Sequence, residues 1–164
     1  MYFGALDTDS RNPAGTRYSG YMATIERHGL KPEFLFAVKT SERRTGFELA
    51  NQLLKNSGKL PDALFCHNDD LALGAMMALQ QAKLRIPDDI SLIGFDDIAE
   101  SSFSVPGLTT VGGVMHKLAT ALVGTLRQAI DTNREPIRIS IVPQLITRGS
   151  TTSRGSTTNK GEAK

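Results

Sequence analysis

Residues 90–97 read Ile-Ser-Leu-Ile-Gly-Phe-Asp-Asp, a short apolar run that stops at two acids. An earlier run of the same kind, Ala63-Leu64-Phe65-Cys66-His67, stops at Asn68-Asp69-Asp70. Between the two lie residues 71–82, which are rich in Ala, Leu and Met and contain no Pro, a composition typical of a helix. Strand, polar turn, helix and strand in this order predict a βαβ unit, and hence a parallel sheet with helices packed on it.

The rest of the chain extends this pattern in both directions. Alternating apolar and polar stretches predict further strands at 2–6, 34–38, 108–111 and 137–142, and further helices at 15–29, 45–54 and 116–130. Residues 151–164 carry no apolar period, so we expect a disordered tail there. The predicted fold class is α/β, a parallel sheet with helices on both faces.

Composition limits the classes of protein that fit. The 164 residues are 40% apolar and 22% charged, as in globular proteins, and 19 basic against 17 acidic residues leave a net charge of +2. That charge is too small for a basic surface that holds a phosphate backbone. The single Cys66, the lack of a signal-peptide pattern and the lack of a long apolar run favour a cytoplasmic protein without a membrane span.

Polar residues at two strand ends form the first candidate site. In open parallel sheets ligands bind beyond the carboxyl ends of the strands, where Asn68 to Asp70 and Asp96 to Asp97 are expected. Carboxylates and an amide suit a neutral polyhydroxy ligand, and Arg17 is a further candidate because it carries five donors. The alternatives remain open that Asp69 or Asp70 merely caps a helix and that Arg17 is solvated.

An enzyme is the weaker hypothesis. Cys66 and His67 are neighbours on a strand, so their side chains point to opposite faces and cannot form one catalytic pair. The known phosphate-loop, dinucleotide, zinc and calcium patterns do not occur in the sequence. We therefore expect no metal and no cofactor, and keep an enzyme with Asp69 or Asp96 as general base only as a third reading.

An ordered set of motifs resembles the LacI/GalR family of bacterial repressors. The motifs run in the family's order over about residues 1–150: Arg17-x-x-Gly20-Tyr21, Asn68-Asp69-x-x-Ala72-x-Gly74-Ala75, Ile86-Pro87-Asp88-Asp89-Ile90-Ser91-Leu92-Ile93-Gly94-Phe95-Asp96-Asp97-Ile98, Pro106-x-Leu108-Thr109-Thr110-Val111 and Leu145-Ile146-x-Arg148-Gly149-Ser150. The resemblance implies a periplasmic-binding-protein-like fold of two lobes that hold a small effector, commonly a sugar, between them.

This resemblance also implies a division of the chain. Residues 1–112 look like the C-terminal lobe, and 113–136 like a crossover helix that packs on an N-terminal lobe. Residues 137–150 would hold the returning strand. A helix-turn-helix headpiece, which reads the operator in this family, has no counterpart in the sequence, so we expect operator binding only through a headpiece outside it.

Site residues follow from the resemblance by position. Arg17, Asn68 and Asp96 match effector-contacting positions, and Ser41 stands where the family often has an aromatic that stacks on the effector. With half of the cleft, the chain is expected to bind an effector weakly or not detectably. The family's homodimer contacts match four residues near 71–82 and 97–105: Leu73, Met76, Met77 and Phe103. A solute-binding protein of sugar transport, which shares this fold, is the alternative.

Overall fold

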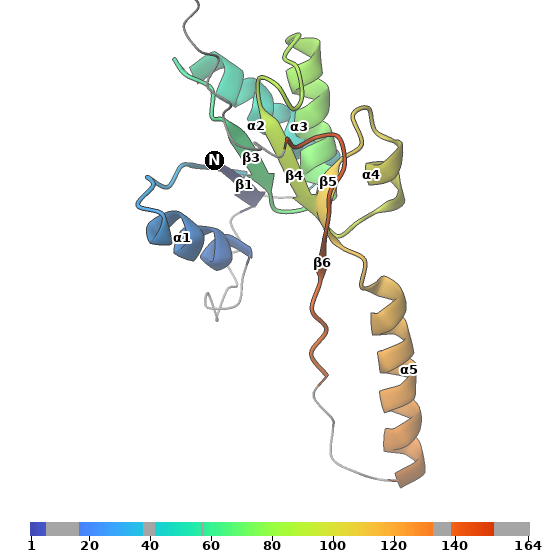
Figure 1. Cartoon of the computed structure of the whole chain (residues 1–164). Coiled ribbons are helices and arrows are strands. Elements are labelled where there is room, and N and C mark those ends of the chain that lie inside the picture. The colour runs from blue at the N-terminus through green and yellow to red at the C-terminus, as the bar shows by residue number, and fades with distance from the viewer. Residues whose placement is uncertain (6–16, 38–41, 57, 133–138, 153–164) are drawn as a thin grey trace, which may run out of the picture.

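The computed structural model describes residues 1–5, 17–37, 42–56, 58–132 and 139–152. In these ranges the chain forms six strands and five helices, in the order β1 (Tyr2–Ala5), α1 (Arg17–Arg27), β2 (Phe34–Ala37), α2 (Arg43–Asn56), β3 (Ala63–Cys66), α3 (Asp69–Gln81), β4 (Ser91–Phe95), α4 (Ala99–Phe103), β5 (Thr109–Gly112), α5 (Met115–Thr132) and β6 (Gln144–Ile146). The predicted βαβ unit is therefore confirmed as β3, α3 and β4 (Figure 1).

All six strands belong to one sheet in the order β2-β1-β3-β4-β5-β6. The first five are parallel, as predicted, and β6 pairs antiparallel with β5, with Thr110 opposite Ile146. The register sets Leu64 beside Leu92 on neighbouring strands, so that β3 and β4 end at the same edge of the sheet. The sheet is thus mostly parallel, with one antiparallel edge strand.

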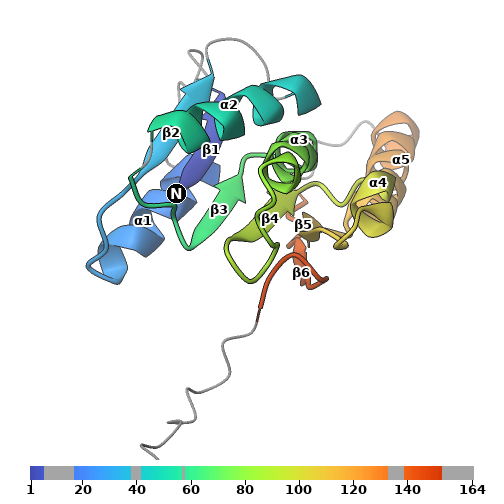
Figure 2. The same cartoon turned by 90° about the horizontal axis from the view of Figure 1, so that it is seen from above.

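One face of the sheet carries the hydrophobic core. Helices α2 and α3 pack side by side over it, as Figure 2 shows from above. Leu64 and Cys66 of β3 and Leu92 of β4 are fully buried against these helices, together with Leu53 of α2 and Leu79 of α3. Burying one such leucine contributes about 1.5–3 kcal/mol, so this layer holds the lobe together.

The opposite face of β1 to β3 is aromatic and is covered by α1. The ring of Tyr2 lies 5.5 Å from the rings of Tyr18, Tyr21 and Phe65, measured between centroids. Tyr2 and the core residue Phe3 are adjacent on β1 and point to opposite faces, as strand geometry requires. The prediction of helices on both faces is confirmed.

Two local predictions are wrong. The strand expected over 137–142 is not formed in its described part, residues 139–142, and β6 begins at Gln144 instead. The apolar alternation there has another cause, because Ile139 and Ile141 line a groove against α5. In addition, the short helix α4 follows Asp96-Asp97, a place where no helix is predicted from the sequence.

Helix α5 leaves the sheet and extends away from it, with the chain that leads into β6 running beside it (Figure 1). None of its described residues is buried. Its apolar positions are exposed, among them Leu118, Leu122, Leu126 and Ile130. Among the described residues no helix has both the length and the apolar character needed to cross a bilayer.

Candidate functional site

The candidate site lies at the carboxyl edge of the sheet, where β3 and β4 end side by side. Residues 67–70 follow β3 and residues 96–98 follow β4, and the N-terminus of α1 reaches the same edge through Arg17. Three segments that are distant in the sequence therefore meet there. This is the edge at which open parallel sheets bind ligands.

Arg17 joins the two strand ends. One guanidinium nitrogen, Nη1, donates to the carbonyl oxygen of His67 at 2.8 Å, and Nη2 donates to Oδ1 of Asp96 at 2.9 Å. The guanidinium carbon also lies 3.9 Å from the ring centroid of Phe95. A planar guanidinium can donate hydrogen bonds in its own plane while its face lies on an aromatic ring.

Asp96 sits in a turn of unusual backbone geometry. Its φ is +112° and that of Asp97 is +57°, in the region that residues other than glycine rarely adopt. The turn directs the carboxylate of Asp96 toward Arg17, while Asp97 accepts a hydrogen bond from Arg148 at 2.7 Å. Partial burial raises the pKa of Asp96, and the positive charge of Arg17 opposes that rise.

Asn68, and not Asp69, caps helix α3. Its Oδ1 accepts a hydrogen bond from the backbone nitrogen of Leu71 at 2.9 Å, and its φ and ψ are extended as in an N-cap. The alternative that Asp69 or Asp70 caps the helix is therefore wrong. Asp70 pairs with Arg43 on α2 at 2.8 Å, and Asp69 is fully buried in a hydrogen-bonded cluster with residues after β4.

Sequence reasoning misses three residues at this edge. Phe95 supplies the ring under Arg17, His67 supplies the carbonyl that Arg17 binds, and Tyr2 donates or accepts a 2.7 Å hydrogen bond between its hydroxyl and Nδ1 of His67. Burial raises the pKa of Tyr2 to about 12, so the phenol keeps its proton at neutral pH. Phe95 could have been found, because it directly precedes Asp96 in the motif.

Other sequence-derived candidates lie elsewhere. Ser41 is outside the described residues. Cys66 is fully buried among the core leucines on the other face from His67, as predicted, and burial raises the pKa of its thiol. In the part of the chain that the structure describes, no three His, Cys, Asp or Glu side chains gather in a way that could hold a metal ion.

The predicted interface residues lie around a shallow groove between α3 and α4. Phe103 is 83% exposed and Met77 is half exposed, and Leu73 lines the groove beside them. Met76 differs from this expectation, because it is 3% exposed and belongs to the core, so that it forms only the floor of the groove. Val105, which is not among the predicted interface residues, adds a further exposed apolar side chain.

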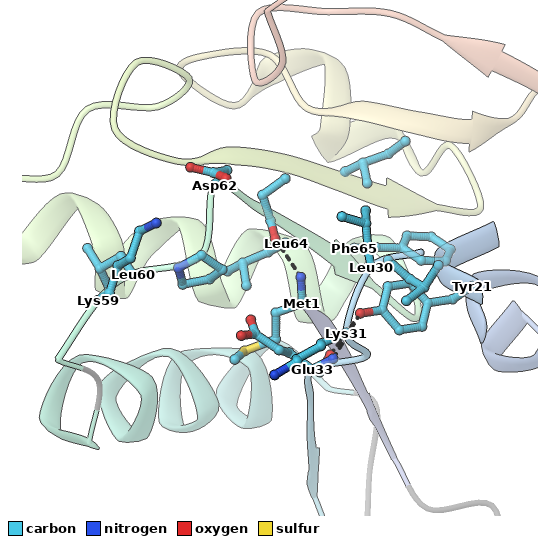
Figure 3. Close-up of a pocket in the computed structure, with 14 residues that line it drawn as sticks. Met1, Tyr21, Leu30, Lys31, Glu33, Lys59, Leu60, Asp62, Leu64 and Phe65 are labelled. Carbon is cyan, nitrogen blue, oxygen red and sulfur yellow. Dashed lines mark hydrogen bonds between the residues drawn. The ribbon is translucent and has the colours of Figure 1, made fainter. Parts of the chain in front are cut away.

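Another groove, of about 500 Å³, lies at the opposite end of the strands (Figure 3). Tyr21 and Leu30 line it from α1 and the turn that follows, and Met1 and Phe65 line it from the sheet. Two of the residues that line it bind each other, because the amino group of Met1 donates a hydrogen bond to the carbonyl of Ala63 at 2.9 Å. It is separate from Arg17 and Asp96, which lie at the carboxyl ends.

Comparison with known proteins agrees with this fold. A family model described as a periplasmic binding protein-like domain matches residues 1–151. The chain is 38% identical over 149 residues to the HTH-type transcriptional repressor PurR of Haemophilus influenzae, and 36% identical over 149 residues to the ribose operon repressor of Escherichia coli. These alignments cover 88% and 90% of this chain, but the chain spans only 44% of the length of either repressor.

Solved structures give the same result. A LacI-type transcription regulator from Bifidobacterium animalis superposes with a TM-score of 0.81 and 30% identity, covering 93% of this chain and 58% of that one. The lac repressor dimer bound to operator superposes with a TM-score of 0.74 and 29% identity, covering 84% and 47%. The chain therefore belongs to the family of periplasmic binding protein-like domains, in the form found in LacI-type transcription regulators. Its relatives are repressors and not enzymes.

Proposed function

We propose that this chain is the part of a LacI-type repressor that receives a small polyhydroxy effector at the edge formed by Arg17, Asn68 and Asp96. The observation that carries the proposal is the meeting of Arg17 with the Asp96 carboxylate and the His67 carbonyl at the carboxyl ends of β3 and β4. These are the ends at which sheets of this architecture bind ligands.

The chemistry of this edge favours a sugar. A carboxylate accepts hydrogen bonds from two adjacent hydroxyls, and a guanidinium donates to hydroxyl or ring oxygens. Among the described residues, Arg17 donates to the His67 carbonyl and to Asp96, and its side chain is 29% exposed, so part of the guanidinium lies at the surface of the edge. The ribose operon repressor among the relatives supports the same ligand class.

In the intact regulator, this edge would face a second lobe across a cleft. Effector binding would favour one arrangement of the lobes, and so change the spacing of the headpieces that read the operator. The exposed apolar positions of α5, from Leu118 to Ile130, support a role for this helix as the crossover that packs on the other lobe. The regulator would act in the cytoplasm, where its operator is.

We further propose that the α3/α4 surface, defined here by Leu73, Met77, Phe103 and Val105, contacts a second copy of the chain. Phe103 and Val105 are 83% and 80% exposed, and apolar residues gathered in this way are typical of an interface. Arg43 and Glu100 line the same groove and could form a polar rim around it. The dimeric lac repressor among the similar structures supports this arrangement.

The proposal is tested by titrating pentoses and hexoses, beginning with D-ribose, into the isotope-labelled chain and recording amide shifts by NMR. Because the chain supplies only one side of the cleft, its dissociation constant for a sugar is expected to be larger than about 1 mM. This corresponds to a binding free energy smaller than about 4 kcal/mol. The shifts should gather at residues 17, 67–68 and 95–98, and Arg17→Met should abolish them. Arg44→Met is the matched control, because Arg44 is exposed and pairs only with Glu48 among the described residues.

Two results would overturn the proposal. One is saturable sugar binding with a dissociation constant of about 1 mM or less that Arg17→Met leaves unchanged. The other is a set of shifted residues that lies elsewhere, for example in the groove under α1.

A further inference from the structure

Asp69 is a buried carboxylate that the candidate site does not use. It is fully buried, and its two oxygens accept three hydrogen bonds within the described structure. Oδ2 accepts from the backbone nitrogen of Ile98 at 3.0 Å and from Oγ of Ser101 at 2.7 Å, and Oδ1 accepts from Oγ1 of Thr110 at 2.6 Å. Burying a carboxylate costs free energy unless it is well hydrogen-bonded. A buried carboxylate with three donors therefore indicates a specific role for Asp69.

Its three donors come from one stretch of chain, which folds around the carboxylate. Ile98 is the N-cap residue of α4, Ser101 lies inside α4, and Thr110 lies on β5. None of them is near Asp69 in sequence, since the nearest is 29 positions away. The carboxylate of Asp69, at the start of α3, thus binds the segment from Ile98 to Thr110 at three points.

Close approach at two glycines fits this arrangement. A Cβ on Gly94 of β4 would collide with Oδ1 of Asp69. A Cβ on Gly112 of β5 would come within 2.9 Å of the carbonyl oxygen of Asp96 and would also meet Asp97. Both strands are therefore shaped to admit the carboxylate and the turn that it supports.

The turn so held is the one that presents Asp96 to Arg17. The backbone nitrogen of Asp97 lies 3.4 Å from Oγ1 of Thr110, which itself donates to Asp69. With Ile98 also bound to Asp69, the two residues of positive φ are tied to the cluster directly after Asp96. A positive φ at two successive aspartates is kept only where the surroundings enforce it.

We propose that Asp69 is a positioning residue that fixes, in one register, the turn presenting Asp96 to Arg17 and the helix α4 that carries Phe103. It does not contact Arg17 itself and acts through Thr110, Ile98 and Ser101. Asp69 thereby joins the candidate effector edge to the α3/α4 surface. The functional meaning of this link rests on the proposed function, whereas the positioning itself is a property of the folded chain.

The test compares Asp69→Ala and Asp69→Asn with wild type by residue-resolved amide hydrogen exchange and by the NMR signal of the Arg17 side-chain Nε–H. Asp69→Ala should speed exchange at Ile98 about tenfold or more, beyond any change in α2, because the amide loses a charged acceptor. The Arg17 signal should move as well. Asn at this position can still offer one oxygen to Ile98. Both changes should therefore be smaller in Asp69→Asn than in Asp69→Ala.

Leu79→Ala is the matched control. Leu79 is fully buried on α3 and has no polar group in the cluster, so this variant lowers stability without touching the turn. Should Asp69→Ala fail to fold, Thr110→Val and Ser101→Ala each remove one donor and carry the same test. The proposal is overturned if exchange at residues 97–103 and the Arg17 signal change no more in the Asp69 or donor variants than in Leu79→Ala.

Titration of D-ribose separates this proposal from the proposed function. Faster exchange at 97–103 in the Asp69 variants, together with a wild-type sugar response that lies away from Arg17 and Asp96, keeps the positioning role and overturns the effector assignment. A sugar response of wild type that Asp69→Ala preserves in full, at the same residues and with the same affinity, overturns the positioning role.

Discussion

The Nη2 atom of Arg17 lies 2.9 Å from Oδ1 of Asp96, although 79 positions separate the two residues in the sequence. The pair connects the N-terminus of α1 with the turn after β4. It lies beside the end of β3, at the carboxyl edge of the sheet. Partial burial raises the pKa of Asp96 while Arg17 favours its charged form. The carboxylate therefore pays a desolvation cost that a neutral side chain would not.

The first prediction concerns how stability changes with pH in Asp96→Asn. Because the pKa of Asp96 is raised by folding, its contribution to stability is fully present below the unfolded pKa and is lost as pH rises through the folded pKa. Wild type should therefore lose stability relative to Asp96→Asn as pH rises from the acidic range toward neutral. The total change should be about 1 kcal/mol or less, since the side chain is partly exposed.

Urea unfolding of both proteins across this range measures the difference, and Asp89→Asn supplies a control of opposite sign. Hydrogen bonds from the side chain and the backbone nitrogen of Arg85, three in all, lower the pKa of Asp89 to about 2. Wild type should therefore lose stability relative to Asp89→Asn as pH falls through the acidic range. A pH dependence of the same sign for both variants would contradict the assignment.

The second prediction concerns the thiol of Cys66, which is fully buried between the sheet and its two helices. Burial raises its pKa, so little thiolate forms in the folded chain and a thiol reagent must wait for the protein to open. The rate at which the thiol is modified should therefore be limited by the rate of unfolding. Both rates should increase together as the urea concentration is raised. Rapid modification of the native chain by a small disulfide reagent would show that the core over β3 is open.

The third prediction concerns the relative protection of α3 and α5. Helix α3 is packed in the core, whereas none of the described residues of α5 is buried. An exposed helix depends on its own marginal stability, so amides of α5 should exchange orders of magnitude faster than those of α3. Hydrogen exchange read by mass spectrometry tests this directly. Equal protection would mean that α5 is covered in solution, and the effect of protein concentration would show whether a second copy covers it.

The fourth prediction concerns self-association through the α3/α4 surface. Leu73 lines the groove beside Phe103, and a charge buried there costs several kcal/mol of association free energy. Sedimentation equilibrium at several concentrations should show a dimer in wild type and a monomer in Leu73→Glu and in Met77→Glu. Leu30→Glu, which adds the same charge at an exposed leucine away from this surface, should stay dimeric.

A wild-type monomer at all concentrations would contradict the proposed dimer surface. A dimer that dissociates equally in Leu30→Glu would place the association elsewhere on the chain. Circular dichroism of each variant establishes that the fold is kept, which matters most for Leu73, because it is partly buried against the core.

Local patterns in the sequence were sufficient to predict most of the sheet. The run at 90–95 and the helix at 71–82 are set by apolar periodicity and by the polar residues that end them, and both are confirmed within two residues. The alternation at 139–142 misled the prediction, because packing against α5 gives the same pattern as a half-exposed strand.

The candidate site was only partly predictable, because its contacts are long range. That Arg17 and Asp96 meet follows from the order of the strands and the position of α1, and the resemblance supports it. The burial of Asp69 could not be predicted, since its partners Ser101 and Thr110 lie 32 and 41 positions away and a capping role fits the local sequence equally well. Asn68 takes the cap instead, which frees Asp69 to point inward.

The most direct test of the effector edge is a crystal structure of this chain soaked with the sugar that gives the largest shifts in the titration. The account predicts sugar hydroxyls within about 3 Å of the Asp96 carboxylate and the Arg17 guanidinium, with Asn68 at the border of the site. A sugar bound in the groove between α1 and the start of the strands, with the Arg17–Asp96 edge empty, would contradict it.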